Sequence, residues 1–413
     1  MDLNLLKREH KLIDIFCELV KIPSPSLKED KVAQKIIEIL KSNNIDVKKD
    51  SYGNVIAKVK PTDTSKKPLL LSAHMDVVGD SSAVNLSLNE DYIETDKSRT
   101  LGADNKAGVA AAILLAIEVN SNKQLKHGGI EIVFTRDEEQ SMSGIHNLDM
   151  SQIESEYILV LDADKLGQVL VSGASFTKLT LTVETFLGGH SGIDIADADR
   201  LNAVKLISEI MSNIPQGVYK KDELGVVTSI NAGAVIGGGV ESGISKLIES
   251  PVESSEFIDF VMKNSMTNII NKKAAAIYSI RSSDKLSEDQ LILEINVIAQ
   301  YYNRKYEGLA RFCVETEIHL LPFEKSDDNT IELVAKDAGQ NEGVDIKVSS
   351  FHAGAETHIY SNNVNKYGKS FKPCLVGIAD IYNMHSADEK IDYKSYLKGY
   401  EFLREFFHLY NCI

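Results

Sequence analysis

The sequence predicts a discontinuous α/β domain, residues 1–177 and 324–413, interrupted by an inserted α+β domain over residues 178–323. Up to residue 164, continuously apolar strand-like runs alternate with helical patterns, which is typical of a mixed sheet flanked by helices. From residue 176, strand-like runs alternate apolar and polar residues, as in a half-exposed antiparallel sheet. After Pro322 the first pattern returns, which marks the middle block as an insertion.

The elements of the α/β domain follow from periodicity and breakers. The segment IPSPSLKED, with its prolines, separates two helical patterns over 5–21 and 29–43. Apolar runs then predict strands over 54–60, 68–75, 129–139 and 157–164, with an Ala-rich helix over 106–120. Beyond the insertion, helices are expected over 330–343 and 392–410, with a strand-like run, CLVGIAD, between them.

The inserted block reads strand–helix–strand–strand–helix–strand, which favours a small sandwich with an open antiparallel sheet. Its expected strands are 176–186, 225–236, 274–284 and 311–323, with one helix over 198–211. A second helix is expected to start near Ser287, because Ser287 and Gln290 have capping-box spacing.

Composition limits the classes of function. The net charge of −15 gives no basic footprint, so we expect no nucleic-acid partner. No apolar run approaches the ~18 residues of a membrane span, and the first residues lack the apolar core of a signal peptide. The four cysteines, Cys17, Cys313, Cys374 and Cys412, have no CxxC spacing. We therefore expect reduced thiols, a cytoplasmic location and no membrane contact.

The most informative segment is LLLSAHMD, an apolar strand that ends at His74 with Asp76 two residues on. Residues i and i+2 of a strand share a face, so Asp76 can orient the imidazole or a bound water. Alone, such a pair is more often a hydrogen-bonded structural pair than a metal ligand.

Further acidic or histidine residues follow other predicted strands or open a helix. They are Asp104 in LGADNKAG, Glu138 and Glu139 in TRDEE, Asp162 or Asp164 in LDAD, and His385 in NMHS. In an open α/β sheet, ligands bind outside the carboxyl ends of the strands, so these side chains can gather along one edge. Each has a plain alternative: an Asp at a helix entry is commonly an N-cap, and a Glu pair is commonly solvated.

Taken together, the set suits two zinc ions. Two histidines, a bridging aspartate and two further carboxylates give each Zn²⁺ one imidazole and two carboxylate contacts. Two such ions lower the pKa of a shared water to about 7 and polarise a carbonyl. Of the adjacent pair, one glutamate can bind metal while the other, Glu138, acts as general base.

These motifs, in this order and spacing, resemble the M-twenty family of co-catalytic zinc metallopeptidases, and the resemblance spans nearly the whole chain. It implies two Zn²⁺ per subunit, with Co²⁺ or Mn²⁺ as alternatives. Residue by residue it implies His74 and His385 as terminal ligands, Asp104 as the bridge, Glu139 and Asp162 on one zinc each, Glu138 as base, and Asp76 behind His74. Asp162 is preferred to Asp164 because the family's aspartate stands five residues before a glycine, here Gly167.

The resemblance also implies roles in the inserted lid and dimerisation domain. His190, in GGHSG, would stabilise the oxyanion in a partner subunit of a homodimer; the alternative is a turn histidine. Arg281 would hold a substrate carboxylate, unless it is an exposed strand charge. Glu356, in HAGAETH, would line the cleft and select substrate. The stretch GGGVESGISK departs from the family because it lacks an Asn and a Pro.

The expected function is therefore hydrolysis of short peptides by a di-zinc exopeptidase, with Glu138 as general base. GADNKAG and TRDEE favour the peptidase T branch, a tripeptide aminopeptidase, whereas GGHSG and HAG resemble the aminoacyl-histidine dipeptidase branch. A dipeptidase, an aminoacylase or another amide hydrolase, and a non-catalytic metal-binding relative remain alternatives. The sequence contains neither GxGxxG nor a P-loop pattern, which argues against a nucleotide-binding protein.

Overall fold

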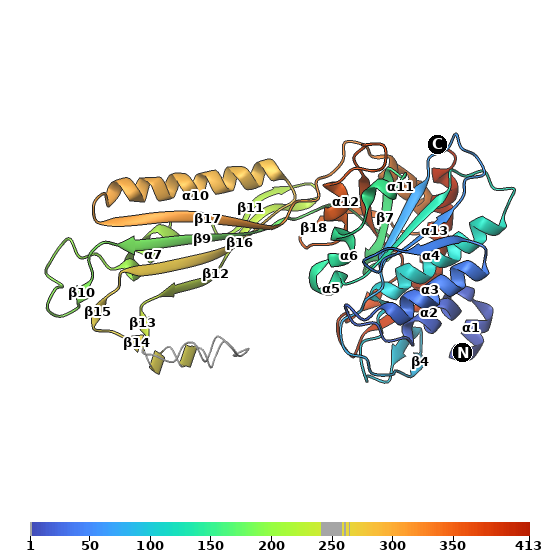
Figure 1. The fold of residues 1–413 in the computed structure, drawn as a ribbon, viewed down its shortest axis with the longest axis horizontal. Coiled ribbons are helices and arrows are strands. Elements are labelled where there is room, and N and C mark those ends of the chain that lie inside the picture. The colour runs from blue at the N-terminus through green and yellow to red at the C-terminus, as the bar shows by residue number, and fades with distance from the viewer. Residues whose placement is uncertain (1, 241–257, 260–261, 264) are drawn as a thin grey trace. The chain divides into compact units, whose positions relative to one another are not determined.

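Figure 1 shows the computed structural model, which describes residues 2–240, 258, 259, 262, 263 and 265–413. The chain divides into two compact units, Met1–Gly173 with Phe323–Ile413 and Ala174–Pro322. An α/β unit and a unit with an antiparallel sheet are the predicted fold class. The boundary expected after residue 177 falls inside a strand of the second unit and lies instead after Gly173; the chain returns at Phe323.

The first unit is built on an eight-stranded sheet. In sheet order its strands are β1 (Asp46–Lys49), β2 (Val55–Val59), β6 (Ile130–Thr135), β3 (Leu69–His74), β7 (Tyr157–Ala163), β19 (Lys372–Gly377), β8 (Gln168–Gly173) and β18 (Lys347–Phe351). The neighbours β6, β3, β7 and β19 run parallel. Antiparallel pairs join β2 to β6 and β19 to β8, so the sheet is mixed. The carboxyl ends of the four parallel strands therefore meet at one edge of the sheet.

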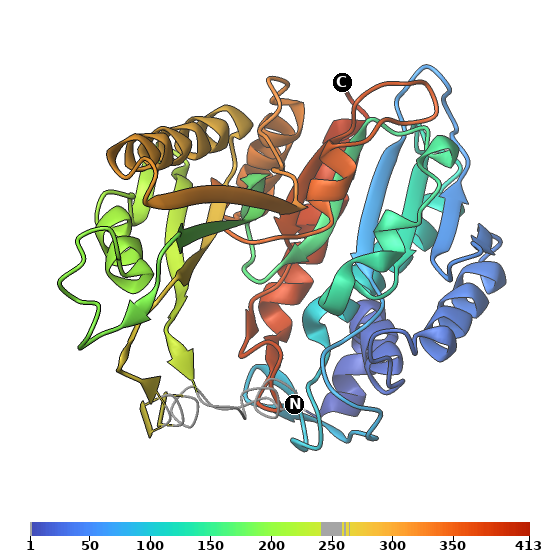
Figure 2. The ribbon, with the colours of Figure 1, turned by 60° about the vertical axis from the view of Figure 1, so that its left-hand side comes forward.

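Helices cover both faces of this sheet, as Figure 2 shows. On one face, α4 (Ala103–Ser121) packs so closely that a Cβ added to Gly108 would lie 2.4 Å from the Leu161 carbonyl oxygen. On the other face, the hydroxyl of Ser72 lies 3.1 Å from that of Tyr360 in α12 (Thr357–Ser361). Neighbouring residues of a strand point to opposite faces of the sheet, so one face contacts α4 and the other contacts α12.

The other helices of this unit are α1 (Leu3–Glu9), α2 (Lys11–Val20), α3 (Asp30–Ser42), α5 (Glu138–Ser141), α6 (Ser143–His146), α11 (Thr330–Glu342) and α13 (Tyr393–Tyr410), with a 3₁₀ turn over Met150–Gln152. The single helix expected over 5–21 is two helices, because the backbone of His10 is extended. Leu6 and Leu12 are buried on either side of the break, so the apolar pattern runs on without revealing it.

A smaller four-stranded sheet carries the loop that bears His385. Its strands, in order, are β20 (Ile381–Tyr382), β21 (Lys390–Asp392), β5 (Tyr92–Thr95) and β4 (Leu86–Asn89). All three pairs are antiparallel. The loop between β20 and β21 is thus fixed at both ends by strand pairing.

The second unit has a five-stranded antiparallel sheet. Its order is β11 (Gly217–Asp222), β12 (Gly225–Gly237), β16 (Lys273–Ser282), β9 (Phe176–Thr185) and β17 (Ala310–Leu320). The alternation expected from residue 176 is confirmed, since Leu179, Leu181 and Val183 are buried between more exposed neighbours. They pack with residues of α7 (Ala203–Met211) and α10 (Lys285–Lys305), and Figure 1 shows α10 lying along the sheet.

The described part of the second unit also contains two short strand pairs: β10 (Gly189–His190) with β15 (Ile269–Ile270), and β13 (Gly239–Val240) with β14 (Ser265–Met266). The expected capping box at Ser287 is wrong. Helix α10 starts at Lys285, because the Asp284 carboxylate accepts the Leu286 N–H at 3.1 Å. Of the stretch GGGVESGISK, residues 241–246 lie outside the described residues. No described helix is long and apolar enough to cross a membrane.

Candidate active site

The parallel strands deliver most of the predicted ligands to one edge of the first unit. His74 is the last residue of β3 and pairs in register with Thr135, the last residue of β6. Glu138 and Glu139 follow β6 at the start of α5. Asp162 is the next-to-last residue of β7. The convergence that the sequence predicted from strand ends is therefore a direct result of sheet order.

Asp104 joins the two histidines of the site. It lies in the irregular first turn of α4, where Gly102 has φ 75° and the Asp104–Asn105 peptide bond is cis. Its Oδ1 lies 3.0 Å from Nε2 of His74, and its Oδ2 lies 3.1 Å from Nε2 of His385. One carboxylate thus faces two imidazoles from segments that are far apart in the sequence.

Each imidazole has a second carboxylate partner. Nε2 of His74 lies 3.3 Å from Oδ1 of Asp162, and Nε2 of His385 lies 3.2 Å from Oε2 of Glu139. Of the two aspartates that the sequence left open, Asp162 is therefore the one placed against His74. The five predicted ligands form two histidine–carboxylate groups that share Asp104.

Asp76 lies behind this cluster and holds the glutamate loop. Its Oδ1 accepts the Glu138 N–H at 3.0 Å and its Oδ2 accepts the Glu139 N–H at 3.1 Å. The Ser26 hydroxyl donates to Oδ2 at 2.8 Å. Nδ1 of His74 lies 3.0 Å from the backbone carbonyl oxygen of Asp76 and 3.4 Å from its Oδ1. Burial alone would raise the pKa of Asp76, but these partners lower it to about 2. Asp76 thus orients His74 through its carbonyl and carboxylate oxygens, and the Glu138–Glu139 backbone through its carboxylate.

The pKa values of the other carboxyl groups are shifted in opposite directions, upward by burial and neighbouring carboxylates and downward by hydrogen bonds from the histidines. Burial raises the pKa of Glu139 and of Asp162 to about 7, with neighbouring carboxylates adding to the shift. Burial would also raise the pKa of Asp104, but hydrogen bonds from His385 and His74 hold it well below its usual range. The Asp104 hydrogen bond raises the pKa of His385 to about 9. So many acidic groups in one buried place call for cations to balance them.

The distances between the imidazole nitrogens and the carboxylate oxygens fit a zinc site. Two ligands at about 2.05 Å in tetrahedral geometry around Zn²⁺ stand about 3.3 Å apart. The imidazole–carboxylate distances here are 3.0, 3.1, 3.2 and 3.3 Å. Ligand atoms of His74, Asp104 and Glu139 all lie within 4.8 Å of one another. Among the described residues, the buried Oε1 of Glu139 and Oδ1 of Asp162 have no hydrogen-bond partner, so each histidine–carboxylate group has an acceptor left for an ion.

Glu356 does not line the site as the sequence predicted. Its side chain is buried, with 1% of the residue exposed, and Oε2 accepts the Ser72 hydroxyl at 3.3 Å. Ser72 lies two residues before His74 on the same face of β3. Glu356 therefore lies beneath the ligands, where a substrate has no access, and the predicted substrate contact is wrong.

His190 and Arg281 both belong to the second unit, so their roles at the site stay predictions. His190 is exposed, and its Nδ1 accepts the N–H groups of Gly192 and Ile193 at 3.1 and 3.3 Å. In the neutral ring this places the proton on Nε2, which is then a donor. The Arg281 guanidinium lies 4.3 Å from the centre of the Phe176 ring.

Two buried glutamates that support the site were not predicted. Glu29 accepts the N–H of Asp137 at 3.0 Å and pairs with Arg136 at 2.9 Å. These contacts hold the two residues that precede Glu138 in place. Glu389 accepts the N–H of Asp104 at 3.1 Å. The available signal was their position, since Glu389 follows His385 by four residues and Glu29 follows the break at IPSPS.

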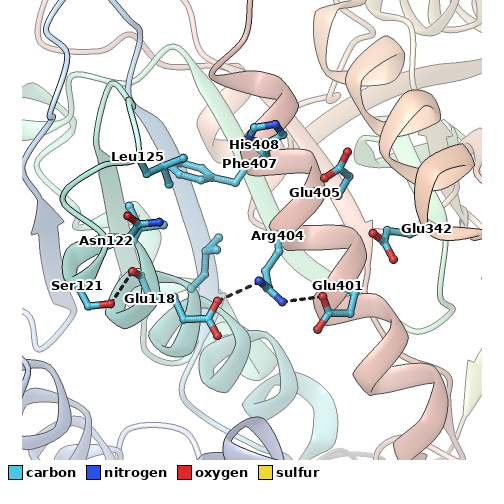
Figure 3. A pocket seen from close by; sticks show the side chains of 12 residues that line it. Glu118, Ser121, Asn122, Leu125, Glu342, Glu401, Arg404, Glu405, Phe407 and His408 are labelled. Atoms are coloured by element: carbon cyan, nitrogen blue, oxygen red, sulfur yellow. Dashed lines mark hydrogen bonds and ion pairs between the residues drawn. The ribbon is translucent and has the colours of Figure 1, made fainter.

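A concave region of the first unit, about 520 Å³ in volume, lies between α4 and α13 and is shown in Figure 3. Its acidic side chains have partners of their own. Arg404 lies 3.1 Å from Glu118 and 2.7 Å from Glu401. This region contains none of the predicted ligands, so it is separate from the histidine–carboxylate cluster.

The sheet edge and the cluster define an α/β protein with a candidate two-metal centre. The chain belongs to peptidase family M20/M25/M40, whose profile matches residues 70–408.

Comparison with curated proteins places the chain among both uncharacterized and named relatives. It is 29% identical over 239 residues to the uncharacterized protein YqjE of Bacillus subtilis, covering 56% of this chain and 62% of that protein. It is 28% identical over 214 residues to the cytosol non-specific dipeptidase of Escherichia coli, covering 45% and 43%. It is 24% identical over 373 residues to peptidase T of Bacillus cereus (strain G9842), covering 75% and 86%. The chain thus spans less than two thirds of the length of the first two relatives.

Solved structures show the same fold. Aminopeptidase PepT from Bacillus cereus superposes with a TM-score of 0.78 at 21% identity, over 97% of this chain and 98% of that one. Aminoacylhistidine dipeptidase from Vibrio alginolyticus gives 0.70 at 19%, over 96% of each chain. The YXEP protein of Bacillus subtilis, described as a dinuclear metal binding peptidase, gives 0.67 at 14%, over 97% and 98%.

The assignment of Asp162, rather than Asp164, as a zinc ligand predicts that variants of the two residues differ in zinc affinity. Asp162→Asn removes a charged oxygen 3.3 Å from Nε2 of His74, so zinc affinity should fall at least about 100-fold. Asp164→Asn is the matched control and should change affinity less than about threefold. Titration of the metal-free protein with chelator-buffered zinc measures both. An equal or larger loss in Asp164→Asn would reverse the assignment.

Proposed function

We propose that the chain is a metal-dependent exopeptidase that hydrolyses short peptides, most like a tripeptide aminopeptidase of the peptidase T kind. The observation that carries the proposal is the Asp104 carboxylate between Nε2 of His74 and Nε2 of His385. His74 with Asp162 would hold one zinc ion, and His385 with Glu139 the other. Co²⁺ or Mn²⁺ would also suit these nitrogen and oxygen ligands.

When bound, two such ions supply Lewis acidity for the scissile carbonyl and acidify a water between them. Glu138 would accept the proton of that water on a carboxylate oxygen and later pass it to the leaving amine. Burial raises the pKa of Glu138 well above its usual range; His74 opposes the shift, and Asp162, Glu356 and Glu139 add to it. A raised pKa suits a group that must first take a proton and then give it up near neutral pH.

The backbone hydrogen bonds to Asp76 support different roles for the two adjacent glutamates. Asp76 holds both the Glu138 and Glu139 N–H groups, so the first turn of α5 cannot rotate freely. Glu139 then faces His385 at 3.2 Å. This constraint supports the assignment of Glu139 as ligand and Glu138 as base.

Two groups of the second unit would complete the reaction. His190, with its proton on Nε2, would donate a hydrogen bond to the oxyanion, in a homodimer to that of the partner subunit. Arg281 would hold a substrate carboxylate through its planar guanidinium.

The relatives favour one alternative substrate. The cytosol non-specific dipeptidase match and the aminoacylhistidine dipeptidase structure support a dipeptidase as the second candidate. Both candidates use the same site chemistry and differ only in peptide length.

The role of Glu138 is tested by Glu138→Gln, which keeps the shape of the side chain and removes its basicity. Turnover should fall by about 10²–10⁴-fold while zinc content stays unchanged. Glu139→Gln, the adjacent control, should instead lose zinc. Measurable turnover in Glu138→Gln within about tenfold of wild type would contradict its role as base.

The substrate class is tested with matched di-, tri- and tetrapeptides, each with a free and an N-acetylated amino terminus, in the presence of Zn²⁺, Co²⁺ or Mn²⁺. We expect hydrolysis of free tripeptides with release of the first residue. Preference for dipeptides would favour the second candidate. Hydrolysis restricted to N-acetylated compounds would refute the aminopeptidase proposal and indicate an aminoacylase.

The cross-subunit role of His190 predicts complementation. His190→Ala and Glu138→Gln should each be nearly inactive alone. Mixed by unfolding and refolding together, they should recover about a quarter of wild-type activity, since half of the dimers pair the variants and each of these has one intact site. Absence of recovery in a mixture shown to contain mixed dimers would place His190 outside the partner's site.

A further inference from the structure

Glu389 is a buried carboxylate that receives three donors from the segment around Asp104. Oε2 accepts the Thr100 hydroxyl and, at 2.7 Å, the Gly102 N–H. Oε1 accepts the Asp104 N–H at 3.1 Å. Only 1% of Glu389 is exposed. Both oxygens are therefore used, and all the donors come from residues 100–104.

The donors belong to the irregular start of α4. Asp104 and Asn105 have non-helical backbone angles, and Gly102, at the N-cap position, offers no side chain. The Asn105 side chain caps the regular helix that follows, because its Oδ1 accepts the Gly108 N–H at 3.2 Å, but it accepts none of the N–H groups of residues 102–104. Glu389 supplies the missing acceptor from a segment 285 residues away. The first turn of α4, with Asp104 in it, is thus held by a residue outside the helix.

The loop of Glu389 also carries His385, and hydrogen bonds within it limit its freedom. The Ser386 hydroxyl donates to the Asn383 carbonyl at 2.7 Å, and the Glu389 N–H donates to the Ser386 carbonyl at 3.2 Å. Directly after Glu389, β21 pairs with β5 and β20. These hydrogen bonds and the strand pairing therefore limit the movement of His385 relative to Glu389.

We propose that Glu389 is a positioning residue that sets the spacing between the Asp104 carboxylate and the His385 imidazole, and so controls the zinc shared by Asp104, His385 and Glu139. The proposal rests on the proposed function only in taking this cluster as a metal centre. Glu389 links the two ligands. It lies on the same loop as His385, and its side chain accepts the backbone N–H of Asp104. The group of His74, Asp104 and Asp162 is also fixed by β3 and β7 and depends on Glu389 less.

The chemistry of the pocket requires a carboxylate. Three donors point at two oxygens, and each oxygen can accept more than one hydrogen bond. Glutamine at this position would turn an NH₂ group toward one of the donors, which leaves a buried donor unsatisfied. Aspartate would keep both oxygens but shorten the reach by one methylene. The two substitutions therefore disturb the same contact in different ways.

The test measures zinc occupancy at graded free zinc in the full chain, together with amide hydrogen exchange of residues 102 and 104 in the metal-free protein. For Glu389→Gln we expect one of two zinc ions to bind about 10–100-fold more weakly and the other to change less than about threefold. Exchange at Gly102 and Asp104 should quicken. Asp388→Asn, an exposed neighbour on the same loop, should leave both measurements unchanged.

Faster exchange in Glu389→Gln with both zinc affinities unchanged would make Glu389 a helix cap only and overturn the proposal. Equal loss of both ions would also overturn it. If Glu389→Gln does not fold, Glu389→Asp carries the same test with a smaller expected loss in the same direction. Two bound zinc ions without any peptide hydrolysis in wild type would refute the proposed function and leave this proposal standing. Absence of zinc binding in wild type would refute both.

Discussion

The candidate site depends on one carboxylate, that of Asp104, which lies between two imidazoles. His74 comes from the end of a buried parallel strand, and His385 from a loop of the smaller sheet. Their Nε2 atoms meet the two oxygens of Asp104 at 3.0 and 3.1 Å. Every other feature of the site serves to bring these three groups together or to place further carboxylates around them.

A buried cluster of this charge is unstable without compensation. Glu138, Glu139, Asp162 and Asp104 lie close enough to shift one another's pKa values. Isolated charges cost several kcal/mol each to bury, so such crowding persists where cations or protons balance it. A pair of divalent ions at the two histidine–carboxylate groups, as we propose, would supply that balance and would account for the choice of ligands.

A second set of carboxylates holds the backbone rather than the ions. Asp76 binds the N–H groups of Glu138 and Glu139, Glu29 binds that of Asp137, and Glu389 binds that of Asp104. Each ties a ligand-bearing turn to a distant segment of the chain. Precise ligand placement needs such support, because an error of about 1 Å in a site is costly.

The sequence predicted the convergence of the candidate ligands better than it predicted the residues that support them. His74, Glu138, Glu139 and Asp162 stand at strand ends, where local pattern and sheet topology together give their position. Glu29 and Glu389 act through backbone N–H groups on distant segments. Their positions near motifs were a signal, but the sequence does not show which N–H groups they accept.

The local predictions that failed did so because the three-dimensional structure overrides the local pattern. Glu356 was taken as a substrate contact because a motif does not reveal that α12 turns it under β3. The break at His10 and the cap at Asp284 are likewise set by backbone geometry within otherwise regular patterns.

The most direct measurement is an anomalous difference map from crystals of the zinc-loaded protein, recorded on both sides of the zinc edge. The account predicts two zinc peaks about 3.5–4 Å apart, one on each side of the Asp104 carboxylate. One peak is expected beside His74 and Asp162, the other beside His385 and Glu139. A single peak, or two peaks that do not share Asp104, would contradict it.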